Sequence, residues 1–389
     1  MKYWRYQSGW RLLPGLLAAG LTFMTARTEV FRPIEHGIYR FLFQARGEQL
    51  WDERVTVIEI DEASLAAIGQ FPWPRHRYVE LLEKLEPANP SVIAFDILFA
   101  ESTEDDADLS IAMARHGNVV LATAWDEQRG VIGPNASVME GAIATGHIHH
   151  NADADGITRT YRPKVNGISA LSIAAVQRYS QQKLATGGIS NVNQNLWLNW
   201  RGFVRSAPRY SFTDVLNGQV PASSFKDKIV FIGFTGADLD EMATPYNHAS
   251  PTAGVYQHIV AANNLLAQDH LQLIIAPVWG MVLFLSPILG YTYFYCPLRV
   301  RLLGSLTATA IWAGVVFFAF NQNYWLPTMV PIMSFISTSG FVILTEGLRG
   351  RLTFFRFTSS VRLGLHTSIE QSSYSGPPMA AKPLSMLDR

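Results

Sequence analysis

Three long stretches without a charged residue follow one another near the end of the chain, at residues 273–296, 302–320 and 325–345. Each is close to the ~20 residues that an α-helix needs to cross the hydrocarbon core of a bilayer. The composition agrees, since 48% of the 389 residues are hydrophobic and only 16% are charged, which is more apolar than an ordinary soluble protein. The sequence therefore predicts three membrane-spanning helices within residues 273–347.

A fourth apolar stretch, "LLPGLLAAGLTFMTA", lies between Arg11 and Arg27. It is shorter than the other three and contains Pro14, which fits either a retained membrane anchor or the apolar core of a cleaved signal peptide. No small-x-small cleavage site follows it, so we favour a retained anchor over residues 1–26.

Orientation follows from the basic residues of the short loops, which prefer the cytoplasmic side. These residues form three sets, Lys2, Arg5 and Arg11 before the first span, Arg299 and Arg301 between the second and third, and Arg349, Arg351 and Arg356 after the fourth. Four spans with both termini inside satisfy every set. Residues 27–272 then form an extracytoplasmic domain, and residues 348–389 form a short cytoplasmic tail. The tail is expected to be largely disordered, because it has few apolar groups.

Within residues 27–272, segments typical of strands alternate with segments typical of helices. "VTVIEID" (55–61) and "SVIAFDILF" (91–99) are apolar enough to be buried strands, and an amphipathic helix lies between them. "DADLSIAMARHG", "NVVLATAW", "GISALSIAAVQRY" and "KIVFIGF" continue the alternation. The predicted fold is an α/β domain with a mostly parallel sheet and helices on both faces.

The helix between the first two strands has an unusual beginning. Pro74 is expected at its first position, and Arg75, His76 and Arg77 follow in its first turn, where the helix dipole disfavours positive charge. Because polar groups gather at the carboxyl ends of parallel strands, Asp61 and Asp96 are the expected partners of Arg75. Either the three residues form a structural ion pair, which we favour, or they belong to a ligand pocket. Trp73, between two prolines, is either a packed corner or an aromatic wall of that pocket.

Several of these segments together resemble a known family. "IDEASLAAIGQFPWPRHRY", "IAFDILF", "DDADLSIAMA", "NADADGITRTYRP", "KDKIVFIGFTGADLDEMATPYN" and "GVYQHIVAANNLL" are similar to the CHASE type 2 extracytoplasmic sensor domain of bacterial signalling proteins. The resemblance covers about residues 55–345, including the three closely spaced membrane helices. It implies a multi-pass protein of the bacterial inner membrane, with the sensor domain in the periplasm or outside. It also implies a histidine kinase, nucleotide cyclase or serine/threonine kinase as the output.

The chain departs from the family pattern in two respects. Family members often carry Gly-Val-Glu-x-His, whereas here Gly254, Val255 and His258 match and Tyr256 replaces the Glu. In addition, residues 348–389 are too few for a kinase or cyclase. The effector is therefore expected to be a separate cytoplasmic protein.

Other chemistry finds little support in the sequence. "NADADG" begins like a calcium loop, but its twelfth position is Arg162 instead of a bidentate Glu, so we interpret it as a tight turn. Three histidines, His147, His149 and His150, lie close together in the sequence. They are candidates for a zinc site or a proton-sensing cluster, but we favour solvated histidines in a turn. "GFTGAD", which contains Thr235, is either a glycine turn or an anion cradle. We expect no metal and no cofactor, and the zero net charge without a basic run gives no sign of nucleic-acid binding.

Three functions remain open. The favoured one is a membrane sensor that binds an extracytoplasmic small molecule or ion and relays the signal through its transmembrane helices. The alternatives are a scaffold that senses nothing and an extracytoplasmic enzyme, which the absence of catalytic motifs disfavours. The expected partners are the bilayer, an unknown ligand, and a cytoplasmic kinase or cyclase or a second copy of the chain. The candidate ligand-binding residues are Asp61, Trp73, Arg75, Asp96, Thr235 and His258.

Overall fold

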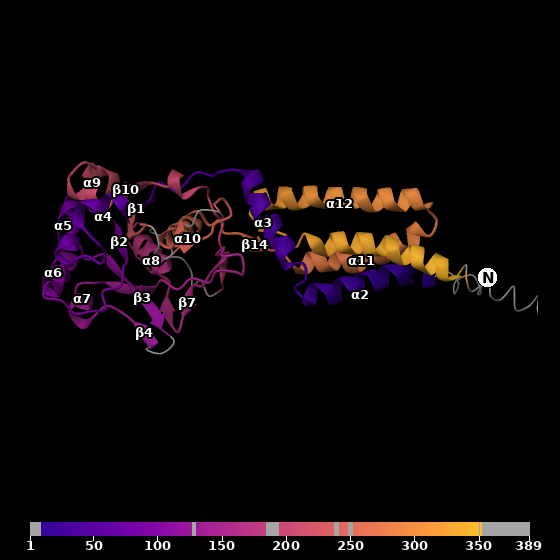
Figure 1. The fold of residues 1–389 in the computed structure, drawn as a ribbon, viewed down its shortest axis with the longest axis horizontal. Coiled ribbons are helices and arrows are strands. Elements are labelled where there is room, and N and C mark those ends of the chain that lie inside the picture. Colours follow the sequence, from indigo (N-terminus) through magenta and orange to yellow (C-terminus); the bar gives the residue numbers. More distant parts are fainter. Residues whose placement is uncertain are drawn as a thin grey trace, which may run out of the picture. The chain divides into compact units, whose positions relative to one another are not determined.

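The computed structural model describes residues 9–126, 130–183, 194–236, 241–247, 252–349 and 351. Its internal contacts divide the chain into two units (Figure 1). The unit that we call the α/β domain comprises Val30–Ala276 and Ala313–Met329. The helix unit comprises Met1–Glu29, Pro277–Trp312 and Val330–Arg389.

A seven-stranded sheet forms the centre of the α/β domain (Figure 1). Its strands are β1 (Val55–Ile60), β2 (Val92–Asp96), β3 (Val119–Asp126), β4 (Gly130–Ile132), β5 (Ala144–His147), β10 (Arg209–Ser211) and β11 (Ile229–Phe234). They lie in the order β10-β1-β11-β2-β3-β4, and β5 also pairs with β3. The pairing of β3 with β4 is antiparallel and the others are parallel. The predicted mostly parallel sheet is confirmed.

Helices cover both faces of this sheet, as predicted (Figure 1). One face carries α4 (Glu62–Ile68), α5 (His76–Leu85), α6 (Asp106–His116), α7 (Ala136–Glu140) and α9 (Phe212–Leu216), and the other carries α8 (Leu171–Lys183) and α10 (Val255–Ala267). Alternate strand residues such as Ile58, Phe95 and Ile232 form one core with the first group, because successive side chains of a strand point to opposite faces. Nearly all of α10 is buried.

The predicted strand–helix–strand unit is confirmed, with two differences. The helix α5 begins at His76 with Arg75 at the N-cap, so the expectation of Pro74 at the first helical position is wrong. Amides of the next residues bond across the turn before it, from Arg77 to the carbonyl of Pro74 and from Tyr78 to that of Arg75. The short helix α4 was not expected, although Asp61 is a good N-cap residue for it.

The rest of the α/β domain consists of α3 (Arg32–Arg46) and short elements. Two-residue strands pair as β6 (Thr160–Tyr161) with β9 (Leu196–Trp197), β7 (Lys164–Val165) with β8 (Ile168–Ser169), β12 (Glu241–Met242) with β13 (Thr252–Ala253), and β14 (Gln272–Leu273) with β15 (Tyr324–Trp325). The 3₁₀ turns are η2 (Glu86–Ala88), η3 (Val204–Ser206) and η4 (Ala222–Phe225). Helix α3 buries Tyr39, Leu42 and Phe43, and Phe43 packs on Phe320 with ring centroids 4.9 Å apart.

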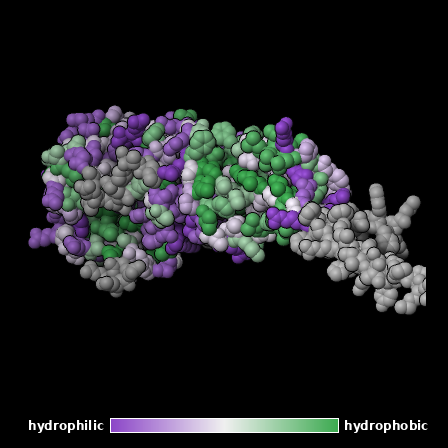
Figure 2. Space-filling view, turned by 45° about the vertical axis from the view of Figure 1, so that its right-hand side comes forward, coloured by the Kyte–Doolittle hydropathy of each residue, from purple (hydrophilic) through white to green (hydrophobic). Residues whose placement is uncertain are grey.

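The apolar helices predicted from the charge-free stretches are confirmed. They are α11 (Ala276–Tyr293), α12 (Leu298–Asn321) and the Met329–Arg349 helix, and each is long and apolar enough to cross a membrane. Most of their length belongs to the helix unit, although the part of α12 from Ala313 onward belongs to the α/β domain. In Figure 2, hydrophobic side chains cover most of the visible surface of these helices, whereas hydrophilic ones cover most of the α/β domain. The turn η1 (Gly9–Leu12) and the 15-residue helix α2 (Leu13–Arg27) precede them, at the position of the predicted anchor.

Close backbone contact and polar bonds hold the helix unit together. A Cβ atom on Gly15 of α2 would lie 2.0 Å from the carbonyl oxygen of Ser286 in α11, so the two backbones can approach only at a glycine. The hydroxyl groups of Ser286 and Ser334 hydrogen-bond to each other. The guanidinium of Arg301 donates two bonds of 2.7 Å to the carboxylate of Glu346. Most of the predicted disordered tail, including residues 352–389, lies outside the described residues.

Candidate ligand site

The carboxyl ends of three neighbouring strands meet at one edge of the sheet. Glu59 of β1 is in register with Gly233 of β11, which is in register with Asp96 of β2. On its other side, Glu59 is in register with Ser211 at the end of β10. Because parallel strands end at the same edge, side chains that are far apart in sequence come together there.

A cavity of about 320 Å³ opens at this edge, and we call it the strand-end pocket. It is lined by Glu59, Asp61, Glu62, Ala63, Val204, Arg205, Arg209, Thr235, Thr252, Ala253 and Tyr256. Three carboxylates, two guanidinium groups and three hydroxyl groups are among these side chains. The volume is at the small end of the range for ligand sites. Asp61 and Thr235, two of the predicted site residues, therefore do share a cavity.

Glu59 is the centre of the polar network in this pocket. Its carboxylate accepts a hydrogen bond from the hydroxyl of Tyr256 and one of 3.1 Å from Nη1 of Arg209. Burial, followed by the charge of Glu59, raises the pKa of Tyr256, so the hydroxyl stays protonated and donates. Burial lowers the pKa of Arg209, but Glu59 and Tyr256 outweigh it and leave the pKa raised.

Asp61 caps a helix with one carboxylate oxygen and also lines the pocket. Its Oδ1 atom caps helix α4 by accepting from the amide of Ser64 at 2.9 Å, and it also accepts from the hydroxyls of Ser64 and Ser211 at 2.6 and 2.9 Å. Such a cap typically stabilises a helix by ~1 kcal/mol. All three bonds reach one oxygen, so within the described residues the second oxygen, Oδ2, is left to accept from a ligand.

Asp96 and His258 lie together behind the pocket, in a buried polar line. Nδ1 of His258 is 2.7 Å from the hydroxyl of Tyr161, which also accepts from the hydroxyl of Ser172 at 2.7 Å. Nε2 of His258 is 4.0 Å from Oδ1 of Asp96. Burial, with smaller effects of His147 and His150, lowers the pKa of His258 to about 3, so its imidazole is neutral near pH 7.

Arg75 does not pair with Asp61 or Asp96, so the predicted partners are wrong. Its Nε is 3.2 Å from Oδ1 of Asp106, its Nη2 donates to the carbonyl of Glu101 at 2.9 Å, and its guanidinium lies 4.8 Å from the centroid of the Phe99 ring. Both partners are buried. The positive helix start is balanced, as expected, but by the first turn of α6 and not by the strand ends.

Trp73 belongs to the hydrophobic core and not to the strand-end pocket. Its side chain is 3% exposed, its Nε1 donates to the carbonyl of Gly69 at 2.8 Å, and its ring lies 4.9 Å from that of Phe212. Of the two interpretations of the proline-flanked tryptophan, the packed corner is confirmed.

The "NADADG" segment forms the expected tight turn. The amide of Gly156 bonds to the carbonyl of Asp153 at 2.8 Å, and Gly156 adopts a φ of 77°, which glycine tolerates best. The carboxylates of Asp153 and Asp155 hold the buried guanidinium of Arg159 at 2.7 Å each. Among the residues that the structure describes, no group of three or more His, Cys, Asp or Glu side chains is arranged to hold a metal ion.

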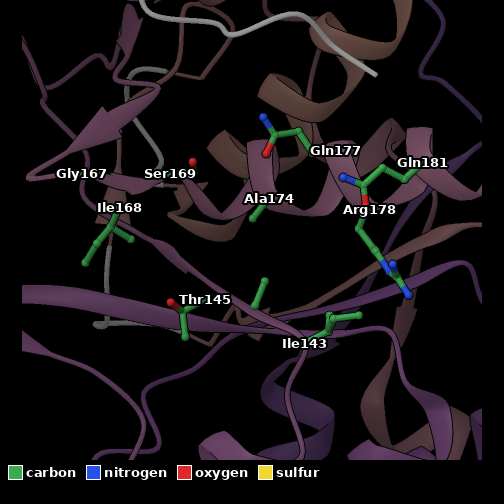
Figure 3. Close-up of a pocket in the computed structure, with 10 residues that line it drawn as sticks. Ile143, Thr145, Gly167, Ile168, Ser169, Ala174, Gln177, Arg178 and Gln181 are labelled. Carbon is green, nitrogen blue, oxygen red and sulfur yellow. The ribbon is translucent and has the colours of Figure 1, made fainter. Parts of the chain in front are cut away.

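A second, larger cavity lies between β5 and α8 and was not expected from the sequence. Its volume is about 500 Å³, and it is lined by Ile143, Ala144, Thr145, Gly167, Ile168, Ser169, Ala174, Gln177, Arg178 and Gln181. Figure 3 shows Ile143 and Thr145 on one wall and Ala174 and Arg178 of α8 on the facing wall. It contains one charged side chain and none of the predicted site residues, so it offers less for recognition of a charged ligand.

Sequence reasoning missed Glu59, Arg209 and Tyr256, the three residues that make the polar network. One signal was available, because Glu59 is a charge inside an otherwise apolar buried strand, and a buried charge requires a partner. Tyr256 stands where family members often have Glu. In this chain, a Glu at that position would bring a second carboxylate towards Glu59.

Comparison with known proteins supports the family but offers no close relative. A family model of the CHASE2 domain matches residues 16–292, which includes most of α2, the whole sheet and nearly all of α11. No curated protein and no solved structure matches the chain. The family match covers well over half of the chain, together with three apolar helices that follow or overlap its end. The chain belongs to the CHASE2 domain family, a family of sensor domains.

Proposed function

We propose that this protein is a membrane receptor that binds a small polar molecule in the strand-end pocket and relays binding to a separate cytoplasmic effector. The observation that carries the proposal is the position of α10. Its first turn contributes Tyr256 to the pocket, and its last turns bond to the segment that contacts the loop between two membrane helices. A ligand that moves one end of this buried, rigid helix would therefore act on the other end.

The far end of α10 is connected to that loop by side-chain amides. Asn264 accepts from the backbone amide of Asn199 at 2.8 Å and donates to its carbonyl at 3.1 Å. Nδ2 of Asn199 in turn donates to Oδ1 of Asn323 at 2.9 Å. Asn323 lies between α12 and the Met329–Arg349 helix. These bonds join the far end of α10 to a segment of the same unit that connects two predicted spans in the chain.

Helix α3 provides a second connection between the same regions. Nη2 of Arg46 donates to Oδ1 of Asn199 at 2.8 Å. At the other end of α3, the carboxylate of Glu35 accepts from the backbone amide of Met329 at 2.6 Å, where the last membrane helix begins. Because α3 follows the α2 segment in the chain, a shift of the domain would reach both the first and the last span.

The charges of the strand-end pocket indicate the class of ligand. Guanidinium groups of Arg205 and Arg209 suit an anionic group such as a carboxylate, while Oδ2 of Asp61 and the nearby Glu62 suit a cationic one. A small zwitterion, such as a free amino acid, satisfies both. We assign no catalysis to the pocket, so turnover of any bound compound by the full chain would contradict the receptor reading.

The arrangement of charges in the helix unit supports a location in the bacterial inner membrane. Three arginines lie at a single end of the helices, where Arg11 contacts Tyr295, Arg301 bonds to Glu346 and Arg349 contacts Trp10. Basic residues at one end are expected for the cytoplasmic side. We therefore place the α/β domain in the periplasm or outside. The effector would be a kinase or nucleotide cyclase, reached directly or through a second copy of the chain.

Ligand-induced stabilisation of the purified full chain tests the proposal, because only a molecule that binds the folded state raises the melting temperature by mass action. A panel of free amino acids is compared with dicarboxylic acids and polyamines, which each carry one sign of charge. We expect an amino acid to raise the melting temperature of the wild type and not that of Arg209→Ala.

Arg178→Ala is the matched control, since it removes an arginine from the β5–α8 cavity instead. It should keep the ligand-induced shift. If Arg178→Ala loses the shift and Arg209→Ala keeps it, the ligand site is the other cavity. If no member of the panel stabilises the wild type, the zwitterion assignment is wrong.

A further inference from the structure

A small cavity lies at the end of the helix unit where the arginines gather, and we call it the arginine-end pocket. Its volume is about 280 Å³, and it is lined by Arg11, Phe294, Tyr295, Glu346 and Arg349. These residues come from η1, from the segment after α11 and from the end of the Met329–Arg349 helix. Figure 2 shows hydrophilic side chains gathered at this end of an otherwise apolar surface.

The charge of the lining favours an anion. The one carboxylate, that of Glu346, already receives two bonds of 2.7 Å from Arg301. Two of the five lining side chains are guanidinium groups, those of Arg11 and Arg349, and the single carboxylate of the lining is engaged by Arg301. Guanidinium groups bind phosphate oxygens through paired, charge-assisted hydrogen bonds.

Aromatic rings hold the two lining arginines in position. The guanidinium of Arg11 lies 4.8 Å from the ring centroid of Tyr295 and donates to its hydroxyl. The guanidinium of Arg349 lies 4.2 Å from the ring centroid of Trp10. Trp10 also packs edge-on against Phe294 at 4.8 Å. Rings of this kind orient a guanidinium, and Trp and Tyr prefer the depth of lipid headgroups.

The surface around the pocket would suit the acyl chains of a lipid. Large apolar side chains near it are exposed, among them Leu12, Leu13, Leu298 and Leu348. A free phosphate ion would make no use of this surface, whereas a phospholipid whose headgroup enters the pocket would cover it with hydrocarbon.

We infer that the arginine-end pocket binds the phosphodiester headgroup of an anionic phospholipid, with Arg11 and Arg349 as its ligands and the exposed leucines beside its acyl chains. On the proposed topology, this lipid lies in the cytoplasmic leaflet, where basic pockets between membrane helices recognise anionic headgroups. The inference does not depend on what the α/β domain binds.

Native mass spectrometry of the full chain, released from mixed micelles, tests this site. Phosphatidylglycerol competes with phosphatidylcholine of the same acyl chains, and the wild type should retain phosphatidylglycerol in preference. The double variant Arg11→Gln with Arg349→Gln should bind it roughly 100-fold more weakly, because each lost bond to a charged group is worth at least about a factor of ten. The double variant with Lys at both positions keeps the charge and should recover much of the preference, which guards against a folding defect.

Arg299→Gln is the matched control, since Arg299 lies at the same end and does not line the pocket. It should weaken binding by no more than roughly fivefold, the effect of one basic residue near an anionic surface. An equal loss in Arg299→Gln and in Arg349→Gln would mean diffuse attraction without a site. Displacement of the lipid by millimolar inorganic phosphate, or equal retention of phosphatidylcholine, would also overturn the inference.

Discussion

Two arginine–carboxylate pairs in the α/β domain have similar geometry and different surroundings. Arg75 and Asp106 approach to 3.2 Å, and their side chains are 9% and 5% exposed. Arg209 and Glu59 approach to 3.1 Å, but the side chain of Arg209 is 44% exposed while that of Glu59 is 7% exposed. Both partners of the first pair are buried, whereas both partners of the second line a cavity and its arginine is exposed. Exposure of the arginine, more than the distance between the charges, distinguishes a structural pair from a candidate binding pair.

The two pairs also differ in how fully the carboxylate is used. Asp106 accepts from Arg75, from the amide and hydroxyl of Thr103 and from Asn135. Burial raises the pKa of Asp106, but these bonds outweigh it and leave the pKa lowered. Glu59 shares its charge with one arginine and one tyrosine, and a ligand can compete for that arginine.

Removal of Arg75 should have the largest effect on stability. Arg75→Ala leaves the carboxylate of Asp106 buried with one bond fewer and without a countercharge, which typically costs ~3–5 kcal/mol. We expect a clear fall in the melting temperature of the full chain. The rise in melting temperature that an amino acid produces should be unchanged, measured from a starting temperature at which the variant is folded.

A double-mutant cycle identifies the partner. Arg75→Ala combined with Asp106→Ala should recover part of the loss, because neighbours in one network are coupled. The effects of Arg75→Ala and Asp96→Ala should simply add. Coupling of Arg75 to Asp96 and none to Asp106 would make Asp96 the partner of Arg75, as the sequence predicted, and the two arginine–carboxylate pairs would no longer differ as described.

The elements of the fold were easier to predict from the sequence than the partner of Arg75. The strands β1, β2 and β11 were predictable because each is a short, nearly continuous apolar run. Helix α5 was predictable from apolar residues spaced along one face of a helix. The partner of Arg75 was not, because Asp106 lies 31 residues further along and the sequence does not tell how α5 and α6 pack.

The candidate site was predictable only in part, for a similar reason. The rule about carboxyl ends placed Asp61 at this edge correctly, whereas Thr235 was a candidate because its segment follows a buried strand and could cradle an anion. The network of Glu59 depends on β10 lying next to β1, although the two strands are about 150 residues apart in sequence. Such a pairing is decided by long-range packing, which leaves no local signal in "PRYSF".

Acidification tests the two buried histidines, His147 and His258. Burial lowers the pKa of His258 to about 3 and that of His147 to about 4, from an ordinary value of 6.5. Below pH 6.5 the unfolded chain gains protons on these residues that the folded chain does not, so the free energy of unfolding should fall as the pH drops from about 6.5 towards 4. Melting temperatures measured across this range should show the decline.

Replacement of both histidines by glutamine separates this effect from the carboxylates. The double variant should lose most of the slope between pH 6.5 and about 5. A smaller slope should remain, because burial also lowers the pKa of His36. At lower pH the double variant should keep the change due to carboxyl groups such as Asp155, whose pKa is lowered to about 2. An undiminished slope in the double variant would show that His147 and His258 are not the residues that resist protonation.

The smallest effect on stability is expected at the open pair. Arg209→Lys keeps the positive charge beside Glu59 but loses the planar fork of donors, and exposed pairs contribute only ~0.2–1 kcal/mol. The melting temperature without ligand should therefore stay near that of the wild type, while the shift produced by an amino acid should largely disappear. Arg75→Lys should behave in the opposite way, with a lower melting temperature and a retained shift. If both lysine variants lower stability equally and both retain the ligand response, exposure does not separate the two pairs, and the strand-end pocket is not where the ligand binds.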